Sequence, residues 1–127
     1  MSFRFEKHYT RAEAKAMLPQ IRAWLARLQG QSKSMVQYEE RVEDLMKDGD
    51  DVGGPTVNKW ITARVDMQML VAEFEKRDIQ LKDLERGLLD FPAVIGGKEV
   101  FLCWEQDEDD IEFWHDLDSG YAGREKL

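Results

Sequence analysis

The sequence predicts an α+β protein that is mainly helical, with a long antiparallel helical hairpin, similar to a coiled coil, followed by a small three-stranded antiparallel β-meander and an ordered tail. Two observations favour this fold. Apolar residues recur with a period of seven in the first half of the chain, and beyond residue 87 they occur in short runs rich in β-branched and aromatic residues. A chain of 127 residues suits a single domain.

The first predicted helix spans residues 11–47. Thr10 and Glu13 have the spacing of a capping box, which places the start of the helix directly after Thr10. Pro19 lacks a backbone donor, so a kink or a restart is expected there. The apolar residues form two series seven residues apart, Ala14, Ile21, Leu28, Met35 and Val42 in the first, and Met17, Trp24, Tyr38 and Leu45 in the second.

A loop and a second helix are predicted next. Residues 48–56, DGDDVGGPT, combine glycine, proline and aspartate and form the loop. The heptad spacing then resumes over residues 57–77, at Trp60, Ala63, Met67, Leu70 and Phe74, which predicts a helix antiparallel to the first. Because this helix is the shorter one, the N-terminal half of the first helix requires another partner.

The predicted meander occupies residues 88–115, with strands at 88–95, 99–104 and 111–115. Gly96-Gly97 and the acidic turn EQDEDD separate these strands. One sheet face is expected to cover the N-terminal half of the first helix, with the acidic turn near the basic residues of that helix. If Ile111 and Phe113 face the helices, His115 lies half buried between the sheet and the first helix. Residues 116–127 form the tail.

The charge distribution argues against nucleic acid as a partner. The net charge is -8, and residues 1–34 hold seven Lys and Arg against two acidic residues, whereas residues 48–127 hold nine against twenty. Because a duplex attracts a basic surface, the acidic remainder would repel it.

Cysteine usage and hydropathy predict a cytoplasmic protein that does not bind membranes. One cysteine, Cys103, cannot form an internal disulfide, and its place in an apolar run predicts a buried, inert thiol. The sequence contains no apolar segment of the length that a membrane span requires, and its first residues lack the apolar run of a signal peptide.

The C-terminal region gathers most of the polar chemistry. The candidate cluster consists of Asp90, Trp104, Trp114, His115, Asp116, Asp118, Tyr121 and Arg124. Beside large aromatic side chains, these groups can form a partly desolvated site for a small molecule, a metal or an anion. They can equally form a structural network in which Arg124 pairs with Asp116, Asp118 or Asp90 and anchors the tail.

A metal site is the less favoured interpretation of this cluster. Its candidate ligands are His115, Asp116 and Asp118, since imidazole and carboxylate groups bind zinc, manganese and iron. In a strand, however, His115 and Asp116 point to opposite faces. We therefore predict no bound metal and no cofactor.

Four segments carry a family resemblance: YTRAEAKAMLPQIRAWLARL at 9–28, GLLDFPA at 87–93, EVFLCW at 99–104 and FWHDLDSGYAGR at 113–124. With them the chain resembles a bacterial family known as domain of unknown function 2203, over nearly its whole length. The resemblance implies a helical hairpin with a small β element. It implies no activity, cofactor or catalytic residue.

The sequence therefore predicts a non-enzymatic cytosolic interaction or oligomerisation module, with a homodimer as the favoured assembly. An unidentified protein or small-molecule partner is compatible with this prediction. The alternative is an enzyme that depends on a small molecule or a metal, with a site around His115, Asp118 and Arg124.

Overall fold

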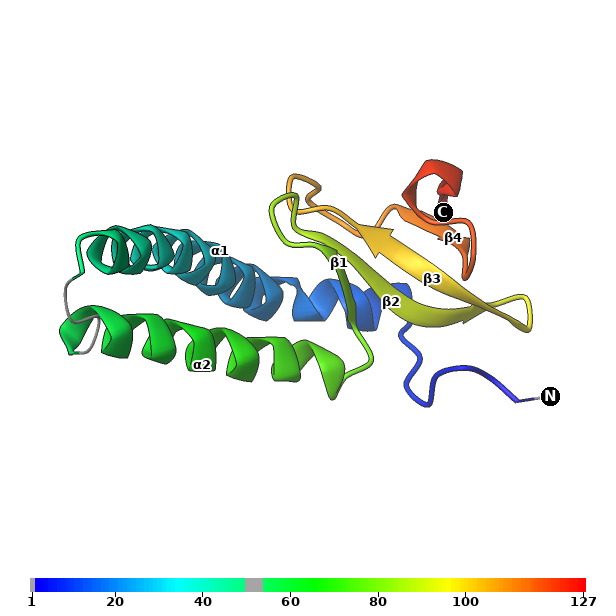
Figure 1. The fold of residues 1–127 in the computed structure, drawn as a ribbon. Helices are drawn as coiled ribbons and strands as arrows, with labels where there is room; N and C mark the ends of the chain where they lie inside the picture. The colour runs from blue at the N-terminus through cyan, green and yellow to red at the C-terminus, as the bar shows by residue number, and fades with distance from the viewer. Residues whose placement is uncertain (1, 50–53) are drawn as a thin grey trace.

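A computed structural model, which describes residues 2–49 and 54–127, places two long helices beside one antiparallel sheet (Figure 1). The elements in chain order are α1 Arg11–Lys47, α2 Pro55–Glu75, β1 Gln80–Asp83, β2 Leu88–Ile95, β3 Lys98–Trp104, β4 Phe113–Asp116, the short 3-10 helix η1 Tyr121–Gly123 and β5 Glu125–Lys126. The α+β class agrees with the sequence prediction.

Helix α1 begins at the predicted capping box. The Thr10 side chain accepts a hydrogen bond from the Glu13 N–H, and the Glu13 carboxylate accepts one from the Thr10 N–H. The helix continues through Pro19 without the predicted restart. Because Pro19 has no N–H, the Lys15 carbonyl lacks its usual helical hydrogen bond. Both residues are exposed, so water can donate to that carbonyl instead.

Helix α2 runs back beside α1, as Figure 1 shows. It begins at Pro55 rather than at residue 57, because proline is well suited to the first helical turn. Its last residue is Glu75, and the chain turns at Asp78, which has a φ of 59°. Of the predicted loop 48–56, residues 50–53 lie outside the described residues.

The sheet has five strands in sequential order, whereas the sequence predicted three. The central strands β2 and β3 pair over their whole length, from Leu89 with Trp104 to Ile95 with Lys98, around a turn in which both glycines have positive φ. The last predicted strand, 111–115, is shifted to Phe113–Asp116. The two additional strands, β1 and β5, are short edge strands with few apolar residues, so they carry little periodic signal.

One face of the sheet packs on the N-terminal half of α1, as the sequence predicts. Five buried residues of α1 share one core with the sheet: Ala14, Leu18, Ile21, Leu25 and Leu28. The sheet contributes Leu89, Phe91, Ala93, Val100, Leu102 and Trp104. Met17 and Trp24, predicted on the buried seam, are half-buried beside it, because the seam rotates toward Leu18 and Leu25 where α1 faces a sheet as well as α2.

The acidic turn after β3 is fixed to the basic end of α1. The Arg22 guanidinium donates to the carbonyl oxygens of Gln106 and Glu108, at 2.9 Å each, and lies 5.0 Å from the ring of Trp104. Lys15 pairs with Asp110 at 3.3 Å. The predicted proximity of this turn and the basic residues of the helix is confirmed.

In the described ranges, no helix is both long enough and apolar enough to cross a membrane.

We expect Arg22→Ala to lower the free energy of unfolding by about 2–3 kcal/mol, because two charge-assisted hydrogen bonds and a cation–π contact are lost. Arg27→Ala is the matched control on the same helix. The Arg27 side chain is 60% exposed, and Gln31 still donates to Asp66 in the variant, so the loss of this pair should cost less than about 1 kcal/mol. Denaturant titration of both variants tests this, and equal losses would contradict the proposed role of Arg22.

Candidate functional site

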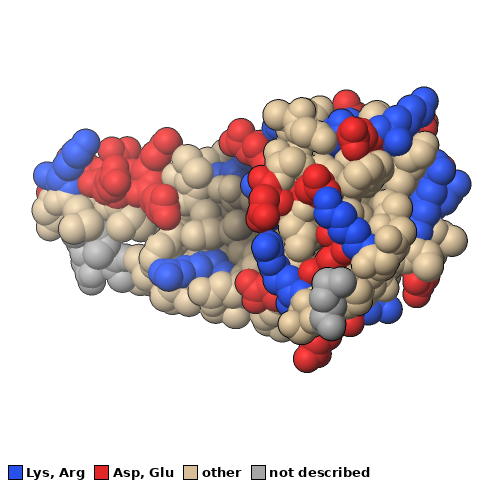
Figure 2. All heavy atoms as spheres, turned by 90° about the vertical axis from the view of Figure 1, so that its right-hand side faces the viewer, with Lys and Arg blue, Asp and Glu red and all other residues tan. Residues whose placement is uncertain are grey.

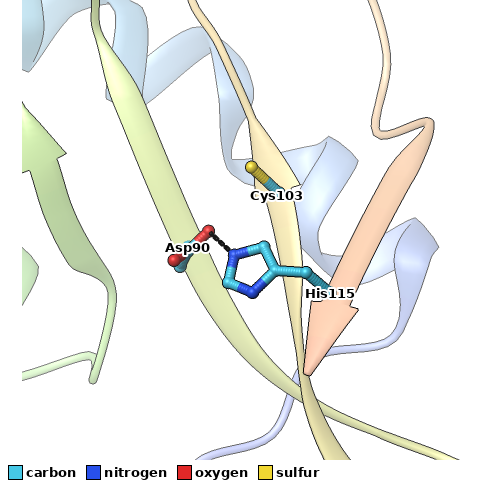
Figure 3. A group of neighbouring side chains, drawn as sticks. All are labelled: Asp90, Cys103 and His115. Atoms are coloured by element: carbon cyan, nitrogen blue, oxygen red, sulfur yellow. Dashed lines mark hydrogen bonds and ion pairs between the residues drawn. The ribbon is translucent and has the colours of Figure 1, made fainter. Parts of the chain in front are cut away.

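Three chemically distinct side chains meet on the sheet face that points away from the helices. Asp90 of β2 is directly opposite Cys103 of β3 in the strand register, and β4 brings His115 beside them (Figure 3). Side chains alternate between the faces of a strand. Because Leu89, Leu102 and Trp114 pack in the helix-facing core, their neighbours Asp90, Cys103 and His115 project to the other face.

This Asp90–Cys103–His115 cluster is almost completely enclosed. The three residues are 2%, 1% and 2% exposed, respectively. Their potential ligand atoms, a carboxylate oxygen, the thiol sulfur and an imidazole nitrogen, all lie within 4.8 Å of one another. Buried polar groups of this kind persist only where they satisfy one another or bind an ion.

The imidazole of His115 has a defined orientation. Its Nδ1 lies 2.6 Å from the backbone carbonyl oxygen of Asp116, and its Nε2 lies 2.9 Å from Oδ1 of Asp90. A carbonyl oxygen can only accept a hydrogen bond, so Nδ1 carries a proton. Nε2 is therefore the ring nitrogen that faces the carboxylate of Asp90.

Cys103 is not arranged as a catalytic nucleophile. Burial raises the pKa of its thiol to about 12, the negative charge of Asp90 adds to the increase, and Arg124 opposes it. In a nucleophile–histidine–carboxylate triad, the histidine contacts the nucleophile through one nitrogen and the carboxylate through the other. Here Asp90 and the Asp116 carbonyl occupy both nitrogens of His115.

A small cavity of about 200 Å³ opens onto the cluster. Its lining consists of the three cluster residues together with Lys82, Leu88, Leu117, Gly120 and Tyr121. The segment after β4 forms one wall, because the chain turns back at Gly120, where φ is 67°. A water molecule or a small ligand can therefore approach the three buried groups from this side.

Arg124 closes the C-terminal segment over the sheet, but its partner is Glu108. Each side chain of the pair is 13% exposed, and the guanidinium also stacks on Phe113 at 3.8 Å and on Tyr121 at 4.5 Å. Burial lowers the pKa of Arg124, yet the hydrogen bonds with Glu108 outweigh this effect and raise it.

The predicted pairing of Arg124 with Asp116, Asp118 or Asp90 is wrong. The acidic turn folds back on itself, with the Glu105 N–H donating to the carboxylate of Glu108 and the Trp104 Nε1–H donating to its carbonyl. This conformation places the Glu108 carboxylate beside the tail.

The structure separates the remaining predicted site residues. Asp116 directs its carboxylate to Lys98 at 2.7 Å, and Asp118, with a side chain 90% exposed, faces Arg4 at 3.5 Å. Trp104 and Trp114 lie on the helix-facing side of the sheet. The proposed ligand set of His115, Asp116 and Asp118 does not converge.

His115 itself was predicted between the sheet and the first helix, and that placement is wrong. Its neighbour Trp114 takes the helix-facing position, because β4 pairs Trp114 with Leu102 and His115 with Phe101. Sequence reasoning also missed Cys103 and Glu108 as neighbours of the site. The alternation of β2 and β3 could have placed Cys103 with Asp90, but only if the strand register had been known.

A second histidine–carboxylate pair lies on the same sheet face, toward the N-terminus. His8 Nε2 is 2.7 Å from the carboxylate of Glu99, which also accepts hydrogen bonds from the backbone N–H groups of Arg4 and Phe5. Burial opposes ionisation of Glu99, but these hydrogen bonds hold its pKa below the usual value. They fix the N-terminal segment to β3.

Comparison with known protein families confirms the resemblance. Residues 7–127 match the family of domain of unknown function 2203 (DUF2203), described as an uncharacterized conserved protein. No curated protein and no solved structure matches the chain.

We expect Arg124→Ala to lower the free energy of unfolding by about 3 kcal/mol, because it leaves the largely buried Glu108 carboxylate without its partner. Arg4→Ala, which removes the exposed pair with Asp118, should cost less than about 1 kcal/mol. Chemical denaturation compares the two variants. An unchanged midpoint for Arg124→Ala would show that the tail does not depend on this pair.

Cys103 should resist thiol reagents in the native protein at pH 8, since with a pKa of about 12 roughly one thiol in ten thousand is ionised. Denaturation should make it react fully. Ser119→Cys, which puts a thiol at an exposed position, provides a matched control that reacts in the native state. Labelling followed by mass spectrometry measures the reaction in the native protein, in the denatured protein and in the Ser119→Cys variant. Rapid labelling of Cys103 in the native protein would contradict the buried site.

Proposed function

The chain belongs to the DUF2203 family, and from its exposed surface we propose that it is a self-associating module whose two copies pair through the outer side of α2. The observation that carries this proposal is that α2 is apolar on two opposite sides. Ala63, Leu70 and Phe74 are buried on one side. An apolar side of a helix is typically covered by another element, and α1 can cover only one of the two.

The second apolar side of α2 is exposed in the single chain. Ile61, Val65 and Met69 are 47%, 47% and 66% exposed. They lie four residues apart, so they form one stripe along the helix. At 100° per residue this stripe lies on the opposite side from the residues that face α1, so α1 cannot cover it.

The residues nearest this stripe are uncharged, and charged residues begin only at its flanks, with Arg64, Asp66, Glu73 and Glu75. We define the outer face of α2 as seven exposed residues within about a third of the helix circumference: Asn58, Ile61, Thr62, Val65, Gln68, Met69 and Ala72. In the whole chain, by contrast, 35% of residues are charged, and the net charge is -8. Because both copies are acidic, their electrostatic repulsion is weakest when they contact each other through this uncharged face.

The outer face is also compatible with a two-fold axis. If two α2 helices pack antiparallel with Val65 at the axis, Ile61 of one copy lies opposite Met69 of the other. Thr62 then lies opposite Gln68, and Asn58 opposite Ala72. Such an isologous contact is the commonest form of protein dimer. A hydrophobic centre with polar ends matches the usual anatomy of an interface.

The projecting helices support the same proposal. We define the helical arm as residues 34–47 of α1 and 55–69 of α2, the end of the helix pair that extends beyond the sheet in Figure 1. Among the described residues of the arm, only Ala63 is buried. An isolated pair of helices with so little buried surface gains stability from an additional partner, which favours a coiled-coil-like bundle in the dimer.

The alternative, an enzyme with a site around His115, Asp118 and Arg124, has less support. Asp118 pairs with Arg4 at the surface, whereas His115 and Arg124 both adjoin Cys103 but are held by Asp90 and Glu108, respectively. Nucleic acid is also a poorly supported partner: Figure 2 shows acidic and basic side chains interspersed over the visible face, and acidic ones gathered on its projecting end.

We expect the wild-type protein to be a dimer and Val65→Glu to weaken it by at least about 30-fold in dissociation constant. Two carboxylates buried at the axis would cost about 2 kcal/mol or more. Sedimentation equilibrium measures the change, and circular dichroism checks that the variant is folded.

Val36→Glu is the matched control, because Val36 is an exposed valine, 52% accessible, on the other helix of the arm. It should leave the dimer intact. A wild-type monomer at all concentrations, or equal dissociation by both variants, would refute the proposed interface.

A further inference from the structure

We propose that Asp90, Cys103 and His115 form a zinc site with an open fourth coordination position that faces the cavity beside Tyr121. This inference is independent of the proposed self-association, because the cluster lies on the sheet and the outer face of α2 lies on the helical arm. It revises the expectation from sequence that the protein binds no metal.

The three donor atoms of the cluster suit zinc. Imidazole nitrogen, thiolate sulfur and carboxylate oxygen are the three groups that bind zinc in proteins. One carboxylate and no other oxygen ligand would serve calcium or magnesium poorly, since these ions require six or more oxygen ligands. The presence of a thiolate further favours zinc over manganese.

The geometry of the cluster also suits zinc. Three neighbouring strands supply the ligands, and the ligand atoms lie within 4.8 Å of one another without any rearrangement of the backbone. Zinc bonds of about 2.0–2.3 Å at tetrahedral angles require ligand atoms roughly 3.2–3.8 Å apart. Binding therefore requires the side chains to move closer together, and Figure 3 shows the three lying near one another with the His115 ring pointing at Asp90.

The groups around the ligands orient His115 for metal binding. Zinc-binding histidines usually donate their second ring N–H to a carbonyl or carboxylate, which fixes the ring and leaves the other nitrogen free to coordinate. His115 meets this condition, because Nδ1 donates to the Asp116 carbonyl and Nε2 points toward Asp90 and Cys103.

Charge balance is compatible with the enclosed position. A carboxylate, a thiolate and a neutral imidazole carry two negative charges, which one zinc ion neutralises. The nearby charge of Arg124 is offset by Glu108. On binding, the thiol of Cys103 loses its proton, because the thiolate is the form that coordinates a metal.

The open position sets the class of ligand. Structural zinc sites have four protein ligands, whereas sites that bind water or substrate have three. The cavity of about 200 Å³ adjoins the three ligands and is also lined by Lys82 and Tyr121. The fourth ligand would be water or a small anion, for which the Lys82 ammonium provides a complementary charge.

Cobalt titration of the metal-free full-length protein tests the proposal, because cobalt replaces zinc and reports on its ligands. One cobalt per chain should bind, with the charge-transfer absorption of a thiolate ligand and the visible bands of a tetrahedral ion. Zinc should displace it and should raise the melting temperature.

Cys103→Ser should abolish the charge-transfer band. His115→Gln should weaken cobalt binding by more than about 100-fold, because loss of a residue that only supports a ligand costs roughly 10- to 100-fold in metal affinity and His115 is itself a ligand. His8→Gln is the matched control, because it removes the other histidine–carboxylate pair and should bind cobalt as the wild type does.

A wild-type protein that binds no stoichiometric cobalt or zinc, or that binds cobalt without a thiolate band, would overturn the proposal even if the variants failed to fold. Equal zinc affinity of Cys103→Ser and wild type would also overturn it, since the metal would then be bound elsewhere on the surface.

Discussion

The register of β2, β3 and β4 is the constraint on which the rest of the structure depends. It directs Leu89, Leu102 and Trp114 into the core beneath the sheet, and in doing so it places Asp90, Cys103 and His115 together on the opposite face. A shift of one residue in any of these strands would exchange the two sets. The large apolar side chains that α1 buries therefore also determine the position of the polar cluster.

The two faces of the sheet are covered in different ways. Helix α1 covers one face with a continuous apolar seam, which supplies most of the hydrophobic stabilisation. Short polar segments cover the other face, and charge-assisted hydrogen bonds hold them: Glu99 fixes the N-terminal residues and the Glu108–Arg124 pair fixes the tail. A face enclosed by polar segments can retain buried ionisable groups and a small cavity, whereas a tightly packed apolar core would exclude both.

The helices and the central strands could be predicted from the sequence, because the capping box at Thr10, the heptad spacing and the Gly96-Gly97 turn are local signals. Strand β1 could not, since Gln80–Asp83 has only one apolar residue and is ordered by its pairing with β2. The site was half predicted: Asp90, His115, Tyr121 and Arg124 were identified, but Cys103 and Glu108 were not. Their roles depend on strand register and on the fold of the acidic turn, which are non-local.

The central claim is that strand register forms a preorganised site at Asp90, Cys103 and His115. The most direct test of this claim is the orientation of the His115 ring. A long-range nitrogen–proton NMR spectrum of the protein can measure it, and His8→Gln assigns the signals because the chain has 2 histidines. The account predicts that Nδ1 of His115 carries a proton protected from exchange, and that zinc shifts the Nε2 resonance while that proton remains. An Nδ1 without a proton, or a ring that exchanges freely with solvent, would contradict it.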